Sequence, residues 1–399
     1  MRWSKMIRAL LLSCLLMSAA TSHANEPRIE CDAAMLVRAR QRIESHEEPF
    51  ATYWSLAKAD AEKSLTRKAT PFLGADSLQF HHAAQEQGIA ARLLAYAWRL
   101  EDDEATGAHA VELLHEWASA MPMPGTAFDP DTRFPNSGMD VARGMLPFVV
   151  AYDLLSGHPT LTVDKRKKIL RWFRALAEGV REGMKRWEES DDFGKQRFQN
   201  HHAAHMLGLT LFGAVLHDRA MMQFAYDSEE NPKDFKDLIR GLILMPGDEP
   251  LGGLRGKPLY AGEIDDRVRT SSGSGLTYCH LSLTLLMFAA DVQSRFRRED
   301  CLNWKAQGGE TLRLSADFYS DFFRAKNATL KGGYYSRDQP HIQNNTPFFG
   351  SFEVALHHWP ESQNIRNLVS SMNRSQTPRS WLCYYGLPLL THGVSELEN

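Results

Sequence analysis

The chain has 399 residues, with 46 lysines and arginines against 49 aspartates and glutamates, and a formal net charge of −3. A mildly acidic chain lacks the basic footprint of a nucleic-acid-binding protein and has no general attraction for a polyanion. Any acidic ligand must therefore be held by local positive groups, and nucleic acid is not an expected partner.

Residues 1–24 have the features of a secretory signal peptide. Basic residues at the start are followed by a short apolar run and by small residues that favour cleavage after Ala24. The run is too short to span a bilayer with margin. A lipoprotein signal ending at Cys14 is the alternative, but the apolar run continues past that cysteine. We expect an exported protein, periplasmic or secreted, with residues 25–399 as one domain and no membrane association after cleavage.

Apolar residues recur at helical spacing through most of the remaining chain. The expected helices lie near residues 88–101, 110–121, 139–156, 163–187, 201–217, 276–294, 309–325 and 361–373. Asp102 and Asp103 mark the break between the first two of them. The third should kink near Pro147 and end at Gly157, and Thr162 is the expected N-cap of the fourth.

Strand-like alternation is scarce, and no low-complexity linker divides the chain. Residues 245–275 are rich in Gly, Pro and charge, and a loop this long in a compact domain is usually functional or mobile. Helices of similar length joined by short breaks indicate antiparallel pairs. The sequence therefore predicts an all-α domain of helix pairs, and periodicity does not separate a ring from a solenoid.

Three of the sixteen histidines, His201, His202 and His205, stand within five residues. His201 and His205 would share a helix face, a spacing that can bind zinc. However, the H-E-x-x-H motif would have Glu where His202 stands, and no third ligand can be assigned. Metal binding, a purely structural role and catalytic use of at least one histidine are the three interpretations, and we favour catalytic use.

Tyr278 lies off an apolar helical stripe and follows a Gly/Ser segment that carries Arg267 and Arg269. Such a tyrosine could line a cavity or pack half-buried at the start of a helix. Its position in the sequence leaves both interpretations open.

Two further segments carry candidate ligand-binding residues. His341 and Asn344 precede a helix, where polar side chains serve either a cavity or turn and capping contacts. Tyr384 and Tyr385 offer aromatic faces that suit sugar stacking, although buried aromatic residues are commoner.

Four segments together resemble one known family. They are ARLLAYAWRLEDDEATGAHAVELLHEWA, NSGMDVARGMLPFVVAYDLL, QNHHAAH and RTSSGSGLTYCHLSL. The chain resembles the alginate lyases, polysaccharide lyases of the mannuronate-cleaving type that fold as an (α/α) toroid. The resemblance implies a single toroid, or incomplete barrel, of antiparallel helix pairs.

The resemblance also implies site residues. Asn200 and His201 match the family's catalytic Asn and His, and Tyr278 matches its catalytic Tyr. The family's arginine is matched by Arg269 or Arg267, although the interval to the tyrosine is longer here. Gln199 stands where the family has a first Asn. The implied catalytic set is Asn200, His201, Tyr278 and Arg269, and the implied substrate-binding set is Arg267, His341, Asn344, Tyr384 and Tyr385.

These residue types suit β-elimination from a 4-linked uronate. Asn200 and His201 would hydrogen-bond the carboxylate and spread the negative charge that follows loss of the C5 proton. An arginine would add a fixed positive charge and favour the phenolate form of Tyr278. On a mannuronate, one tyrosine could take the proton and return one to the leaving oxygen. No metal or other cofactor is required.

We therefore expect a metal-independent, monomeric lyase whose partner is an acidic polysaccharide, with mannuronate-rich alginate as the first choice. Glucuronan or another uronate polymer is the second. The alternatives are an (α/α) glycoside hydrolase, which needs two placed carboxylates, and a non-catalytic glycan-binding protein, which does not need Tyr278.

Overall fold

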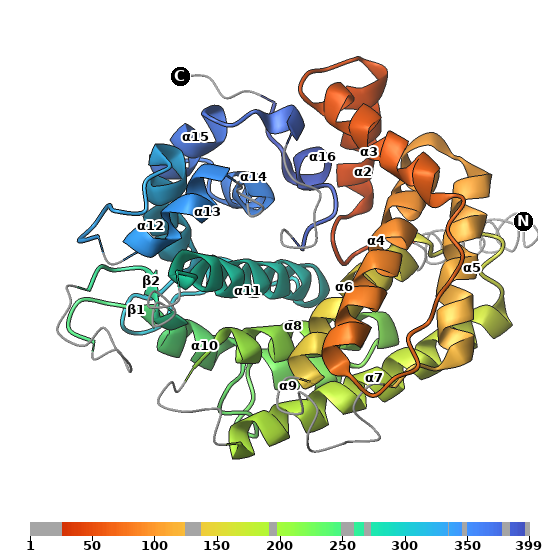
Figure 1. The fold of residues 1–399 in the computed structure, drawn as a ribbon, viewed down its shortest axis with the longest axis horizontal. Helices are drawn as coiled ribbons and strands as arrows, with labels where there is room; N and C mark the ends of the chain where they lie inside the picture. Colours follow the sequence, from red (N-terminus) through yellow and green to blue (C-terminus); the bar gives the residue numbers. More distant parts are fainter. Residues whose placement is uncertain are drawn as a thin grey trace, which may run out of the picture.

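The computed structural model describes residues 26–123, 137–190, 198–248, 259–266, 273–333, 335–344, 349–376 and 384–395. The expected signal peptide at residues 1–24 lies outside the described residues. In Figure 1, the helices follow the chain around a ring whose first and last helices come close together.

The first half of the ring contains α2 (Ala33–Glu44), α3 (Phe50–Ser64), α4 (Ser77–Glu101), α5 (Glu104–Ala120), α6 (Ser137–Leu154) and α7 (Val163–Glu189). The second half contains α8 (Asn200–Leu216), α9 (Arg219–Tyr226), α10 (Phe235–Leu242), α11 (Gly275–Arg297), α12 (Leu312–Ala325), α13 (Gln339–Asn344), α14 (Phe349–His358), α15 (Gln363–Ser370) and α16 (Pro388–His392). Two short strands, β1 (Ile243–Leu244) and β2 (Glu263–Ile264), pair antiparallel with Ile243 opposite Ile264. The all-α expectation is confirmed.

Hydrophobic patterning separates inner from outer helices. Helices α4, α6, α8 and α11 pack against one another in chain order, while α5 and α7 cover them. Almost every residue of α6 and α8 is buried. In α7, by contrast, Ile169, Trp172, Leu176 and Val180 form one buried stripe and charged residues cover the other face. A helix that is apolar all round must be enclosed by protein, whereas an amphipathic helix covers a surface.

One described helix, α11, is long and apolar enough to cross a membrane by length and composition. However, 89% of its apolar window is buried inside the protein. Its apolar character is therefore accounted for by its place among the inner helices.

A buried ion pair joins the two ends of the chain to α4. The guanidinium of Arg92 lies 3.8 Å from the carboxylate of Glu30, and its Nη1 donates to the carbonyl of Tyr384 at 2.7 Å. Glu30 in turn accepts from the backbone N–H of Leu387 at 3.3 Å. Helix α16 then packs against α2 and α3, which closes the ring.

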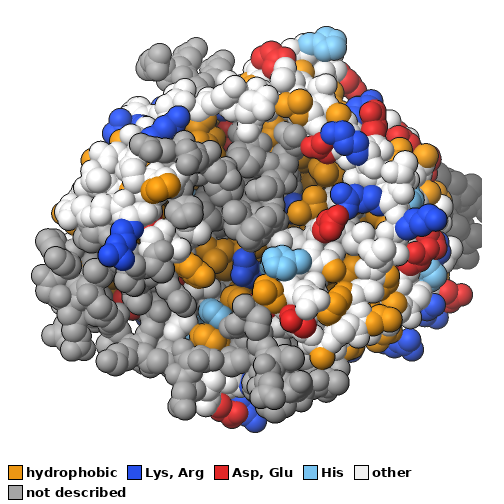
Figure 2. Space-filling view, viewed as in Figure 1, with side chains coloured by type: hydrophobic (Ala, Val, Ile, Leu, Met, Phe, Trp, Pro, Cys, Tyr) orange, Lys and Arg blue, Asp and Glu red, His pale blue; other side chains and the backbone are white. Residues whose placement is uncertain are grey.

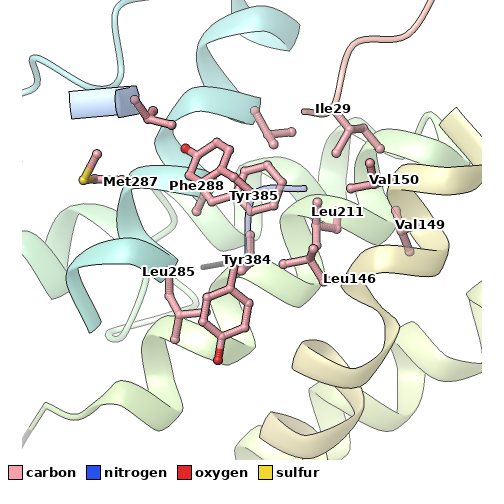
Figure 3. Packing of buried hydrophobic residues seen from close by; sticks show 14 of the residues in the cluster. Ile29, Leu146, Val149, Val150, Leu211, Leu285, Met287, Phe288, Tyr384 and Tyr385 are labelled. Carbon is pink, nitrogen blue, oxygen red and sulfur yellow. The ribbon is translucent and has the colours of Figure 1, made fainter. Parts of the chain in front are cut away.

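The C-terminal segment enters the core between the inner helices (Figure 3). The rings of Tyr384 and Tyr385 lie among apolar side chains of α6 and α11, including Leu146, Leu285 and Phe288. Burial of this segment fixes the last part of the chain against the first.

Candidate active site

The candidate site is built around the start of α8. Asn200 is the first residue of the helix and is only 1% exposed, and His201, the second, is 6% exposed. Asp266, two residues after β2, accepts the Asn200 backbone N–H through Oδ2 at 2.9 Å. Its Oδ1 lies 3.4 Å from Asn200 Nδ2. The buried carboxylate therefore caps the helix and orients the Asn200 amide.

Trp187, in the last turn of α7, lies flat against the imidazole of His201. The ring centroids are 3.8 Å apart and the planes differ by 9°. This stack fixes the plane of the His201 ring. Trp187 was not singled out in the sequence, because it continues the buried stripe of an amphipathic helix.

His202 and His205 have structural contacts instead. His202 Nδ1 accepts the backbone N–H of Gln199 at 3.2 Å, within the N-terminal cap of α8. His205 is fully buried against Gly138, where an added Cβ would lie 2.7 Å from Nε2. Burial holds the pKa of His202 well below its usual range and lowers the pKa of His205 to about 3. Both rings are therefore neutral near pH 7, and His201 and His205 have different neighbours.

Tyr278 lies in the first turn of α11, next to α8. Its backbone N–H donates to the carbonyl of Ser274 at 3.0 Å, and its side chain is half-buried. Ser282, one turn further along α11, donates its hydroxyl to Asp266 Oδ2. The same carboxylate oxygen thus contacts the helix that begins with Asn200 and the helix that carries Tyr278.

For four of the expected site residues, the structure describes no side chain. Arg267 and Arg269 lie outside the described residues, and so do the side chains of His341 and Asn344, whose backbone belongs to α13. Their expected roles stay predictions.

Tyr384 and Tyr385 are both buried. Tyr385 packs on Phe288 with ring centroids 4.4 Å apart. The Tyr384 hydroxyl accepts from Nε of Arg143, on α6, at 2.7 Å. Arg143 is only partly buried and was not picked out by the sequence pattern. The substrate-binding roles expected for the two tyrosines stay predictions, and Arg143 is a further cation beside one of them.

The face drawn in Figure 2 shows Lys or Arg and His side chains beside hydrophobic ones at the centre of the ring, next to residues that are not described. A pocket of ≈ 980 Å³ lies elsewhere, at the other ends of α8 and α11, and is lined by Arg28, Arg219, Arg297 and Arg298 among others. Two of these, Arg297 and Arg298, stand at the C-terminal end of α11 and balance its partial negative charge. We therefore place the candidate site at the helix starts, not in this pocket.

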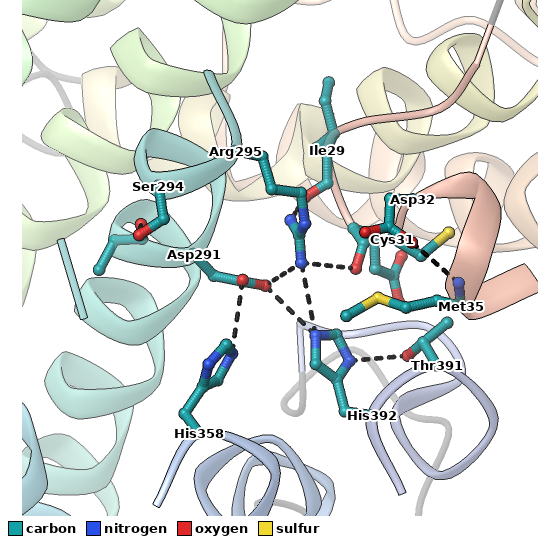
Figure 4. Close-up of polar contacts among 12 residues, drawn as sticks. Ile29, Cys31, Asp32, Met35, Asp291, Ser294, Arg295, His358, Thr391 and His392 are labelled. Carbon is teal, nitrogen blue, oxygen red and sulfur yellow. Dashed lines mark hydrogen bonds and ion pairs between the residues drawn. The ribbon is translucent and has the colours of Figure 1, made fainter. Parts of the chain in front are cut away.

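One group among the described residues has the ligand types for a metal: Asp291 of α11, His358 of α14 and His392 of α16 (Figure 4). Asp291 lies 3.5 Å from His358 Nε2 and 3.4 Å from His392 Nε2. However, Arg295 Nη2 lies 2.5 Å from the Asp291 carboxylate and 3.4 Å from His392 Nε2. A guanidinium therefore already supplies the positive charge that a metal would bring.

The pKa values of Asp291 and His392 fit an ion pair with Arg295 beside a neutral His392. Burial would raise the pKa of Asp291, but the charge of Arg295 and the contacts from both histidines hold it well below its usual range. Burial lowers the pKa of His392 to about 4. The cluster is a closed ionic contact that joins α11, α14 and α16.

A family model described as alginate lyase matches residues 42–243, half of the chain. The chain belongs to the alginate lyase family. It is accordingly a polysaccharide lyase.

Solved alginate lyases share its fold. An alginate lyase from Bacteroides ovatus is similar with a TM-score of 0.61 at 15% identity, over 90% of this chain and 98% of the other. Alginate lyase A1-III from Sphingomonas species A1 gives 0.58 at 12% identity, over 92% and 97%. A Tyr-to-Phe variant of A1-III complexed with a tetrasaccharide gives 0.53 at 13%, over 77% and 85%.

These identities establish the fold alone, and the expected (α/α) toroid is confirmed. No curated protein sequence matches this alginate lyase family member.

Proposed function

We propose that this lyase cleaves mannuronate-rich alginate by β-elimination, with Tyr278 as the proton-transferring residue. The observation that carries the proposal is the carboxylate of Asp266, which contacts Asn200 at the start of α8 and Ser282 one turn beyond Tyr278. Residues that match the family's Asn, His and Tyr thus come from the adjoining starts of two packed inner helices.

In the proposed reaction, the Asn200 amide and the His201 imidazole hydrogen-bond the uronate carboxylate and make the C5 proton more acidic. The positive end of the α8 dipole also favours negative charge near this end of the helix. Tyr278 removes the C5 proton, the C4–O bond breaks, and a proton from the tyrosine passes to the leaving oxygen. The products are a 4,5-unsaturated uronate and a shortened chain, and no water is consumed.

Two further points belong to the same proposal. Arg269, with Arg267 as the substitute, supplies the fixed positive charge beside the tyrosine, and His341 and Asn344 contact neighbouring sugars. Cleavage after Ala24 exports the enzyme to the periplasm or the medium, where such polymers occur. The tetrasaccharide complex of an A1-III variant supports an oligosaccharide as ligand.

The test is a panel of polymannuronate, polyguluronate and glucuronan, followed by the ultraviolet absorbance of the unsaturated product. Polymannuronate should give the fastest rise. A faster rise on glucuronan would move the substrate to the second choice. New reducing ends without absorbance would indicate a hydrolase, and binding with neither signal would indicate a glycan-binding protein.

A further inference from the structure

Asp266 is a fully buried carboxylate placed between the two helices that carry the proposed catalytic residues. Its Oδ2 accepts from the backbone of Asn200 and from the hydroxyl of Ser282, while its Oδ1 faces the Asn200 side-chain nitrogen at 3.4 Å. A helix cap alone needs only the backbone contact. The contacts to the Asn200 amide and to α11 go beyond capping.

The amide contact has a direct chemical consequence for Asn200. A carboxylate only accepts hydrogen bonds, so it selects the orientation in which Nδ2 points toward Asp266. One Nδ2 hydrogen is then directed at Asp266, and the second remains to donate to a bound carboxylate. Rotation of the amide by half a turn would present an oxygen to Asp266 and to the same region, which is unfavourable on both sides.

We infer that Asp266 is a positioning residue of the lyase site: it sets the orientation of the Asn200 amide and fixes α8 against the first turns of α11. This inference rests on the proposed function. Asp266 also directly precedes Arg267 in the sequence.

The decisive substitution is Asp266→Asn. An asparagine has the same shape and keeps one oxygen for the backbone N–H of Asn200 or for Ser282. Its NH2 group then faces Asn200 Nδ2, so two donors oppose each other and the Asn200 amide must turn or shift. Misplacement of a contacting group by about 1 Å can lower turnover about 100-fold. We expect kcat to fall about 10- to 100-fold, with a much smaller change in KM.

Asp234→Asn is the matched control. Asp234 is also buried and caps a helix, since it accepts from the backbone of Asp237 at 2.9 Å and of Ser228 at 2.7 Å. Loss of either aspartate should lower the melting temperature. Only Asp266→Asn should lower kcat per folded molecule, and Asp234→Asn should keep the parent value.

Ser282→Ala keeps the carboxylate and removes only its contact to α11. It should lower kcat by a few-fold, and it serves as the test should Asp266→Asn not fold. If Asp266→Asn folds and keeps the kcat of the parent, Asp266 acts only as a helix cap. If Asp266→Asn does not fold, a parent-like kcat in Ser282→Ala leads to the same conclusion. A parent enzyme that forms no unsaturated product from any uronate polymer overturns the proposed function, and this inference with it.

Discussion

Two groups of histidines in this molecule look alike in residue type but differ in how the fold brings their side chains together. His201, His202 and His205 adjoin in the sequence, yet each has different neighbours: a tryptophan ring, a helix cap and a glycine of α6. His358 and His392 come from separate helices and converge on Asp291. Nearness in the sequence predicts a shared helix, and only the fold decides which side chains meet.

The two regions also differ in charge. At the start of α8, the positive end of the helix dipole favours negative charge, and the buried carboxylate of Asp266 accepts the Asn200 backbone N–H there. Around Asp291, the negative carboxylate is already neutralised by Arg295, and the contacts reach the backbone oxygens of Ile29 and Glu30 as well. The first region carries the residues proposed to bind an acidic ligand, and the second is complete without one.

The largest expected effect is on turnover in the first region. Tyr278→Phe removes the hydroxyl that transfers the proton and keeps the packing of the ring against the hydrophobic core. We expect normal folding, retained polymer binding and a loss of about 10²–10⁴-fold in kcat. Steady-state rates with polymannuronate and a binding titration measure both quantities. Turnover close to that of the parent would remove Tyr278 from the mechanism.

In the second region the corresponding change affects stability. Asp291→Asn leaves Arg295 buried without its counter-charge, which typically costs about 3–5 kcal/mol. The control is Glu182→Gln, which breaks an exposed pair with Arg186 and should change stability by less than about 1 kcal/mol. Urea unfolding compares the two variants, and activity per folded molecule should stay constant in both. A large activity loss in folded Asp291→Asn would mean that the cluster acts on catalysis.

His201→Ala and His205→Ala separate the two roles within one turn of α8. His201→Ala should lower kcat by about 10²–10³-fold, the effect of losing one donor to developing negative charge. His205→Ala opens a cavity beside Gly138 and should cost about 1–3 kcal/mol of stability, with turnover within a few-fold of the parent. If the alanine at 205 abolishes turnover while the alanine at 201 does not, the motif has been placed one turn too early.

Much of the fold could be predicted because the inner and outer helices differ in their pattern of hydrophobic residues. The break at Asp102 and Asp103 is confirmed: Asp102 adopts the left-handed conformation with φ 56, and Asp103 caps α5. Thr162 is confirmed as the N-cap of α7. The sequence analysis did not assign α2 and α3, which have 12 and 15 residues. It also missed the short helices α9, α10, α14 and α16, since short helices have little periodicity and depend on tertiary packing.

The site was less predictable, because its supporting residues lie far from it in the sequence. Asn200, His201 and Tyr278 are predicted from motifs. Asp266 and Trp187 carry no motif, and a buried carboxylate or tryptophan becomes significant only when its partner is known. The Asp291 cluster was invisible for the same reason, since α11, α14 and α16 meet only in the ring.

A smaller effect is expected from pH, and it comes from both regions. His205 and His392 are fully buried, with pKa values lowered to about 3 and about 4, so the unfolded chain binds protons before the folded chain does. Stability should therefore fall as the pH decreases from about 6.5, by at most about 1.4 kcal/mol per pH unit for each of these histidines. Urea midpoints between pH 7 and pH 5 measure the slope. His205→Ala should have a shallower slope than the parent, and an equal slope would mean that His205 takes up its proton in the folded protein as readily as in the unfolded chain.

The smallest expected effect is that of metal. Asp291, His358 and His392 have the residue types of a zinc site, but Arg295 contacts the carboxylate at 2.5 Å and would have to leave before a divalent cation could enter. Placing a metal cation beside the guanidinium of Arg295 is unfavourable, because both are positively charged. The three histidines of α8 offer no alternative metal site, because His201 and His205 face different neighbours. Treatment with a chelator should therefore change neither kcat nor the melting temperature, and added zinc should not stabilise the protein. Stoichiometric zinc in the purified enzyme, with a rise in melting temperature that Asp291→Asn abolishes, would show that Arg295 moves aside and that the second region is a metal site.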